Sequence, residues 1–96
     1  MKVYLTAILQ AKPGSIDLLK SLLDDLVIAS NQEQSCIQYE LYQDSTDESR
    51  FIFRETWASE AGLLTHNSQP HLQEFLARSE DLIDGSIHVY KTRKLS

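Results

Sequence analysis

The stretch Phe51-Ile52-Phe53-Arg54-Glu55-Thr56-Trp57 decides the fold, because it is dense in the aromatic and β-branched residues that are typical of a β-strand. The polar segment before it, residues 44–49, is turn-prone. Before that segment, apolar and polar side chains alternate over residues 36–43. The two strands and their short connection predict an antiparallel hairpin.

The chain before the hairpin contains a strand and a helix. Residues 2–10 alternate with the period of two that a strand shows. The break at Lys12-Pro13-Gly14-Ser15 is followed by apolar residues at helical spacing from Ile16 to about Asn31. This stripe predicts a helix that packs one face against the sheet.

The chain after the hairpin repeats the helix and the strand. A helical segment opens at Ser59, and Pro70 interrupts it at the first turn of a second helical piece, which Asp84-Gly85 closes. Residues 86–92 alternate again. The sequence therefore predicts an α+β fold of ferredoxin-like β-α-β-β-α-β order, an antiparallel four-stranded sheet with helices on one face.

Length and charge limit the function classes. The 96 residues fit one domain, residues 1–96, and the formal net charge is −5. This balance argues against nucleic acid and membrane partners, because both need clustered positive charge. The one basic cluster, Lys91, Arg93 and Lys94, is interpreted as a solvated tail. The start of the chain is interpreted as a strand and not a signal peptide, so we expect a cytoplasmic protein.

Both faces of the predicted sheet carry large apolar residues. Tyr4 and Ile8 point to one face of the first strand, and Val3 and Leu5 point to the other. In the hairpin, Ile52 likewise points away from the face of Phe51 and Phe53. The helices cover only one face, so a second copy of the sheet is the simplest cover for the other. The sequence therefore predicts a homodimer with its sheets packed face to face.

The residues that could carry chemistry gather around the hairpin's second strand. Glu55 lies between Phe53 and Trp57 on one strand parity, where burial would raise its pKa and make it a proton acceptor. The alternative is a carboxylate that pairs with a cation or caps a backbone group. Trp57 could equally be a core residue whose indole N–H is bonded at the rim.

The three histidines and the single cysteine do not form a recognisable metal motif. His66 and His71 are five residues apart across Pro70, which is not the i, i+4 spacing of zinc helices, so we expect no metal and no bound nucleotide. Both imidazoles could also be structural or surface residues. Cys36 is the only cysteine and has no neighbouring base, so we expect a small buried apolar residue.

The chain resembles the antibiotic biosynthesis monooxygenase domain family, the small dimeric α+β barrel proteins that include quinol monooxygenases. The resemblance covers nearly the whole chain, and its most characteristic part is 51–57 continuing through His66, Ser68 and Pro70-His71. The family usually has Glu-Gly-Cys where this chain has Gln34-Ser35-Cys36, a small departure at a turn.

The resemblance implies a monooxygenase that needs neither metal nor flavin. A deprotonated phenol or quinol can itself pass an electron to dioxygen, so the protein supplies an apolar pocket, a base and hydrogen bonds. Glu55, His66 and His71 are then the candidate bases. Trp57 and Phe53 would form the wall, the indole N–H would donate to a substrate oxygen, and Tyr39 would contact the substrate.

Other activities occur in similar proteins, so alternatives stay open. One alternative is a binding or stress-related dimeric module that holds a small molecule without turnover. Relatives of the same fold also include haem-degrading proteins and isomerases of small molecules. Oxygen uptake with hydroquinones would distinguish a monooxygenase from a module that only binds. A Soret band on haem addition would indicate a haem-degrading protein.

Overall fold

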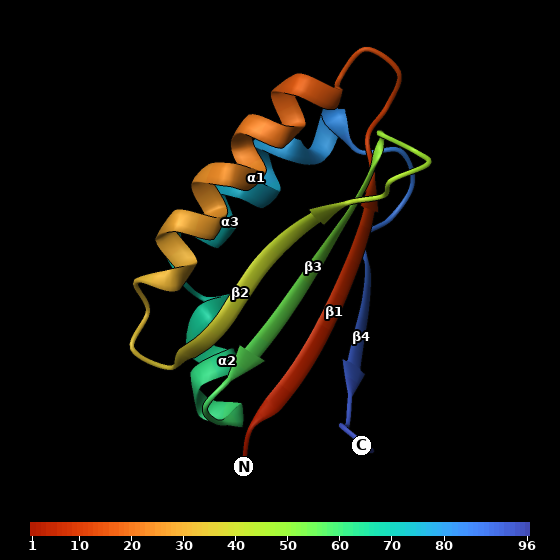
Figure 1. The fold of residues 1–96 in the computed structure, drawn as a ribbon. Helices are drawn as coiled ribbons and strands as arrows, with labels where there is room; N and C mark the ends of the chain where they lie inside the picture. Colours follow the sequence, from red (N-terminus) through yellow and green to blue (C-terminus); the bar gives the residue numbers. More distant parts are fainter.

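The sheet contains four antiparallel strands in the order β2-β3-β1-β4 (Figure 1). The computed structural model describes residues 1–96. The strands span β1 Val3–Gln10, β2 Cys36–Gln43, β3 Arg50–Trp57 and β4 His88–Thr92. The first strand of the chain is thus central, with β3 on one side and β4 on the other.

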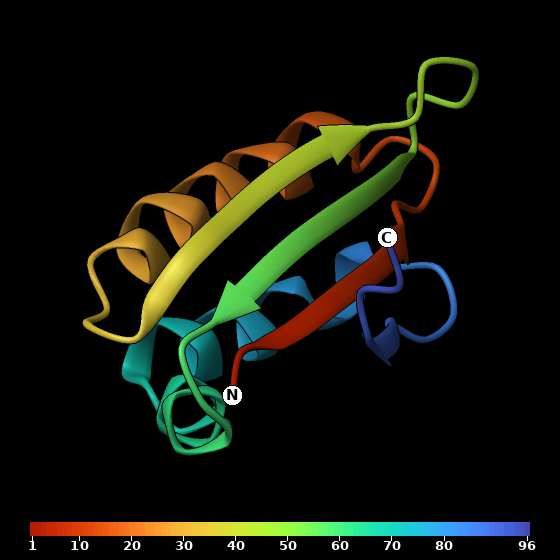
Figure 2. The same ribbon diagram turned by 60° about the horizontal axis from the view of Figure 1, so that its bottom comes forward.

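All helices lie on the same face of this sheet, and the opposite face is bare (Figures 1 and 2). They span α1 Ile16–Asn31, α2 Glu60–Asn67, α3 Pro70–Ser79 and the single 3₁₀ turn η1 Glu80–Leu82. The order and class agree with the fold predicted from the sequence. None of the helices is both long and apolar enough to cross a membrane.

Local sequence explains where the helices α2 and α3 begin. The side chain of Ser59 accepts a hydrogen bond from the Gly62 amide at 3.1 Å, which satisfies a free N–H of the first turn of α2. Pro70 opens α3, where its missing N–H costs nothing. The break between the two helices turns α3 back across the sheet against α1, which it contacts.

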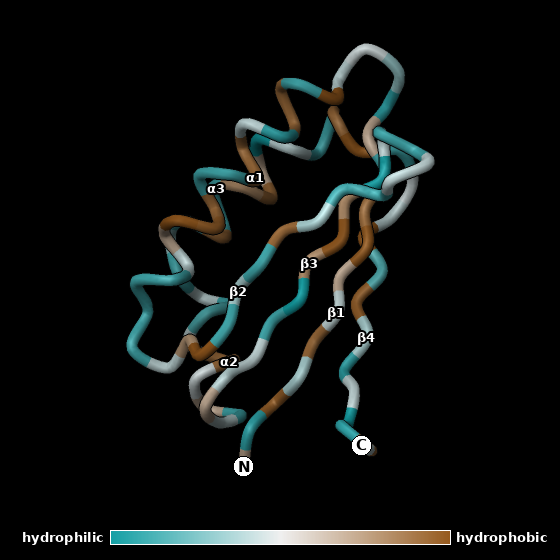
Figure 3. Tube along the Cα trace, viewed as in Figure 1, coloured by the Kyte–Doolittle hydropathy of each residue, from teal (hydrophilic) through white to brown (hydrophobic).

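The core lies between the sheet and the helices. Alternate residues of β1 face the helices and are buried, and β3 contributes Phe51, Phe53 and the fully buried Trp57. The apolar stripe of α1 covers them with Leu19, Leu23 and other buried leucines. Figure 3 shows the hydrophobic stretches of α1 and β1 between hydrophilic turns.

The bare face carries the other parity of the strands. Ile8 of β1 lies directly opposite Ile52 of β3, and Tyr4 opposite Thr56. These side chains of β1 and Ile52 are partly exposed in the single chain. The expectation that apolar residues occupy both faces is therefore met, although Arg54 and Thr6 lie among them.

Two details differ from the sequence prediction. The second helical piece ends at Ser79 and not at Asp84-Gly85, because Ile83 leaves the helix to form a bridge with Ala11 at the end of β1. β2 contains an irregularity between Cys36 and Gln38, so Ile37 does not share the buried face of Tyr39 but is 51% exposed. Periodicity alone cannot show either event, because both depend on a partner strand.

Candidate functional site

An apolar cavity of about 240 Å³ lies between the sheet and the helices α2 and α3. Its sheet side includes Leu5, Tyr39, Phe53 and Glu55, and its helix side includes His66. Twelve of its 15 lining residues are hydrophobic. A concave apolar space with a few polar groups is the usual form of a small-molecule site.

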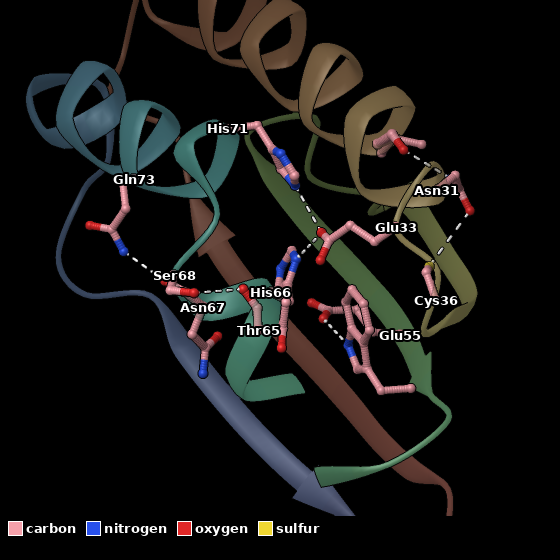
Figure 4. A network of polar contacts seen from close by, with 12 residues as sticks. Asn31, Glu33, Cys36, Glu55, Thr65, His66, Asn67, Ser68, His71 and Gln73 are labelled. Carbon is pink, nitrogen blue, oxygen red and sulfur yellow. Dashed lines mark hydrogen bonds and ion pairs between the residues drawn. The ribbon is translucent and has the colours of Figure 1, made fainter. Parts of the chain in front are cut away.

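Glu55 is the carboxylate of this cavity, and Trp57 holds it in place. The two side chains leave β3 on the same face, and the indole Nε1–H of Trp57 donates to Oε1 of Glu55 at 3.0 Å (Figure 4). Glu55 is 7% exposed, and its Oε2 atom has no hydrogen-bond partner within the chain. Burial raises the pKa of Glu55, the charge of Glu33 raises it further, and the indole hydrogen bond opposes the increase.

A second polar group joins the two histidines through Glu33 (Figure 4). The Oε2 atom of Glu33 lies 2.6 Å from Nδ1 of His66 and 2.8 Å from Nε2 of His71. Because an ionised carboxylate only accepts, each imidazole donates an N–H to it. Glu33 comes from the loop after α1, His66 from the last turn of α2 and His71 from the first turn of α3.

His66 connects these two groups. It is 3% exposed, its ring stacks on Trp57 with 4.4 Å between centroids, and it lies 5.5 Å from the ring of Tyr39. Burial lowers the pKa of His66, and the hydrogen bond and charge of Glu33 oppose this change. Burial and the charge of Glu55 raise the pKa of Tyr39 far above its usual value, so Tyr39 stays a neutral hydroxyl.

The structure brings together most of the residues that the sequence singled out. Tyr39, Phe53, Glu55 and His66 line the cavity. Trp57 does not line it but lies behind His66, and its indole N–H is already used by Glu55 and so does not face a substrate oxygen.

His71 also lies outside the cavity wall, on the far side of Glu33, where it is 24% exposed. Sequence reasoning missed Glu33. The one available signal was that Glu33 is the only acidic residue between Asp25 and Glu40.

Cys36 is a poor nucleophile in this setting. It is partly buried against the core, and burial together with the charges of Glu33 and Glu55 raises the pKa of its thiol to about 11. A thiol with a pKa this high is almost entirely protonated near neutral pH. The chemistry available to the cavity is therefore acid–base and hydrogen-bonding chemistry by Glu55, His66 and Tyr39.

The chain matches known proteins over most of its length. Residues 2–78 match the family model described as "Antibiotic biosynthesis monooxygenase". "Putative monooxygenase YcnE" of Bacillus subtilis is 30% identical over 90 residues, which cover 94% of this chain and 95% of that protein. "Uncharacterized protein sll1783" of Synechocystis is 32% identical over 85 residues, 86% of this chain, and the match spans 58% of that protein's length.

Solved structures show the same fold. PA3566 from Pseudomonas aeruginosa is 30% identical and superimposes with a TM-score of 0.93 over 99% of this chain and 95% of its own. Rv0793 from Mycobacterium tuberculosis has a TM-score of 0.93 over 100% of this chain and 97% of its own. At 23% identity, the second likeness shows the fold alone.

Proposed function

The chain belongs to the antibiotic biosynthesis monooxygenase family, and we propose that it oxidises a small phenol or quinol with dioxygen in the apolar cavity. The observation that carries this proposal is the buried carboxylate of Glu55 on a wall whose other residues are hydrophobic except for His66 and Asn67. The names of relatives support a monooxygenase, and the substrate class is our inference from the cavity.

The size and lining of the cavity favour a compact aromatic ligand. Its volume of about 240 Å³ lies below the roughly 300–1,000 Å³ of pockets for drug-sized molecules. The rings of Tyr39 and Phe53, with centroids 5.0 Å apart, offer an aromatic surface beside Glu55. A planar molecule of one or two rings, with a hydroxyl directed at the carboxylate, fits these features.

Glu55 is the proton acceptor in this proposal. A general base works best when its pKa lies near the working pH, and burial raises the pKa of Glu55 in that direction. Trp57 fixes one carboxylate oxygen, so the other is left for the substrate hydroxyl. His66 and the neutral Tyr39 complete the polar part of the wall and can hydrogen-bond the substrate's oxygen.

The reaction balances without an external reductant. Glu55 takes the hydroxyl proton, and the phenolate transfers one electron to dioxygen, giving a phenoxyl radical and superoxide. These combine into a ring-bound peroxide, whose O–O bond breaks to leave a quinone carbonyl. The ring loses the hydrogen at that carbon as a proton, and the other oxygen atom leaves as water with this proton and the one that Glu55 returns. One phenol and one dioxygen thus give one quinone and one water, with all electrons from the substrate.

Oxygen uptake with a panel of hydroquinones and naphthols tests the proposal. We expect Glu55→Gln to lower kcat/KM by about 10²–10⁴-fold, the usual range for loss of a general base. Glu74→Gln is the matched control, because Glu74 is an exposed residue of α3 whose side chain pairs with Arg78. A folded Glu55→Gln protein with full activity would refute the role of Glu55. Tight phenol binding without oxygen uptake would instead support the binding module.

We also propose that the protein is a homodimer. Proteins of this fold are typically dimers, and this chain leaves the sheet face that carries Ile8 and Ile52 without cover. A sheet with partly exposed aliphatic residues on its open face is stabilised when a second sheet packs on it. We expect the interface to bury more than roughly 1,000 Å² in total.

A further inference from the structure

We propose that Glu33, His66 and His71 form a binding site for one divalent transition-metal ion such as Zn²⁺. The site lies beside His66 at the ring nitrogen that faces Glu33. The proposal does not depend on the oxygenase function, whose proton acceptor is Glu55, although His66 belongs to both the cavity wall and this cluster.

The donor atoms suit such an ion. Two imidazole nitrogens and one carboxylate oxygen form a ligand set found in zinc sites that keep one position open for water. The three atoms, Oε2 of Glu33, Nδ1 of His66 and Nε2 of His71, all lie within 4.8 Å of one another. Zinc bonds of about 2.0–2.1 Å in a tetrahedron place ligand atoms about 3.4 Å apart. The two hydrogen-bonded contacts, at 2.6 and 2.8 Å, would therefore open by less than about 1 Å.

Three separate segments hold the donors in position. The Glu33 loop is fixed by backbone hydrogen bonds from the Glu33 amide to Ser30 at 3.1 Å and from the Cys36 amide to Glu33 at 3.1 Å. His66 is locked by its stacking on Trp57. His71, in the first turn of α3, is the one partly exposed donor and so can adjust. To bind an ion, each ring would carry its proton on the other nitrogen, so that a lone pair faces the ion.

Charge and access also favour a cation. The Glu33 side chain is only 10% exposed, and its partners are the two imidazoles, with no lysine or arginine in contact. A buried carboxylate is unfavourable unless a positive group compensates it. Glu33 and His71 line an open groove of about 640 Å³ with Gln32, Thr65 and Gln69, through which an ion and a water ligand can enter.

This proposal revises the expectation of no metal site that came from the sequence. That expectation counted only His66 and His71, whose spacing across Pro70 fits no zinc motif. The fold adds Glu33 from a position more than 30 residues away in the chain. Because the three ligands come from three separate segments, no short sequence motif marks the site.

Zinc titration of the chelator-treated protein by calorimetry tests the site. We expect one Zn²⁺ per chain, and a visible absorption spectrum of four-coordinate Co²⁺ when cobalt replaces zinc. Glu33→Gln and His71→Ala should each weaken binding by more than about 100-fold, the upper end of losses caused by groups outside the ligand shell. Both substitutions affect residues that are not fully buried, and circular dichroism checks that the variants are folded.

His88→Ala is the control, because His88 is an exposed histidine of β4 outside the cluster. Its binding should equal that of the unmodified protein. The proposal is overturned if the unmodified protein binds no Zn²⁺, or if binding survives in both Glu33→Gln and His71→Ala. It is also overturned if His88→Ala removes binding, because the ion would then lie elsewhere.

Discussion

At the scale of single residues, Glu55 carries a cost in stability. Its pKa is higher in the folded protein than in an exposed glutamate, because burial disfavours the charge. A group with a raised folded pKa favours folding below its unfolded pKa, and this contribution is lost as the pH rises through the folded pKa. At neutral pH, which lies above the ordinary pKa of a glutamate, the buried Glu55 therefore destabilises the fold.

We therefore expect Glu55→Gln to stabilise the protein, although the same substitution is expected to lower kcat/KM. The amide oxygen can still accept the indole hydrogen bond of Trp57, and no buried charge remains. We expect the Tm to rise by a few degrees at pH 7.5, and the difference to vanish near pH 3, below the ordinary glutamate pKa of about 4.3, where Glu55 is protonated in both states. Scanning calorimetry at the two pH values measures this, and a lower Tm at pH 7.5 would contradict it.

In the proposed reaction, we expect Trp57 to act through Glu55 as a positioning residue, because its indole N–H is bonded to that carboxylate. The indole hydrogen bond lowers the pKa of Glu55, and Trp57→Phe removes the bond while it keeps most of the ring volume. We expect the acid limb of the pH profile of kcat/KM to move to higher pH. If Trp57 had a purely structural role, the substitution would lower kcat/KM equally at every pH. The pH profile therefore distinguishes a positioning role from a structural one.

Strand parity was enough to predict part of this site. Phe53, Glu55 and Trp57 leave one strand with a spacing of two, so they had to share a face. The sequence offered a cation or a backbone group as the partner of Glu55, whereas the structure pairs this carboxylate with the indole N–H of Trp57. Glu33 could not be predicted, because a loop residue has no periodicity and its two partners belong to other elements.

At the scale of elements, α2 packs unusually closely on the loop before β2. A Cβ atom added at Gly62 would lie 2.4 Å from Cβ of Ser35 and 2.7 Å from its Oγ. Ser35 also accepts a backbone hydrogen bond from Ala58 at 2.9 Å, so the loop cannot simply withdraw. This contact keeps Glu33 and His66, which belong to the same loop and helix, within hydrogen-bonding distance.

Gly62→Ala should therefore destabilise the fold, although alanine favours helices. Overpacking costs about 1–3 kcal/mol, against a helix-propensity gain of about 1 kcal/mol. Ser35→Gly removes the opposing Cβ, so the double variant should recover most of the loss. Urea unfolding of the unmodified protein, the two single variants and the double variant gives the coupling energy between positions 62 and 35. Additive effects would show that the two positions do not contact each other.

The periodicity of the sequence predicted the helices and strands correctly, but it did not predict where α3 ends. The helix α1 and the strand β1 each bury one face, so the spacing of their own apolar residues is enough to predict the type of element. The end of α3 at Ser79 depends on Ile83, which pairs with a strand that the local sequence does not contain. Interactions between distant segments decide such boundaries.

At the scale of the whole molecule, the open sheet face is the surface where we propose that the two chains of the dimer meet. Ile8 and Ile52 lie opposite each other at its centre, between β2 and β4. Ile52→Asp would bury a charge without a partner in the proposed interface, so we expect a monomer of 11.0 kDa and reduced solubility. Light scattering at micromolar concentration reports the mass.

Leu18→Asp is the matched control for that substitution. Leu18 is an exposed aliphatic residue of α1, in the helix layer and not on the open sheet face. This variant should stay dimeric. A dimer in Ile52→Asp would place the interface elsewhere, and a monomer of the unmodified protein would refute the dimer.

The central position of β1 has a consequence for synthesis on the ribosome. β1 is made first, yet Val3 pairs with Trp57 and Tyr4 pairs with Thr92. The nascent chain therefore carries an apolar strand with one edge unpaired until residues 88–92 have left the exit tunnel. Unpaired strand edges are sites where chains join one another. We therefore expect that slow emergence of residues 88–92 lengthens the time during which this edge of β1 is open to other chains.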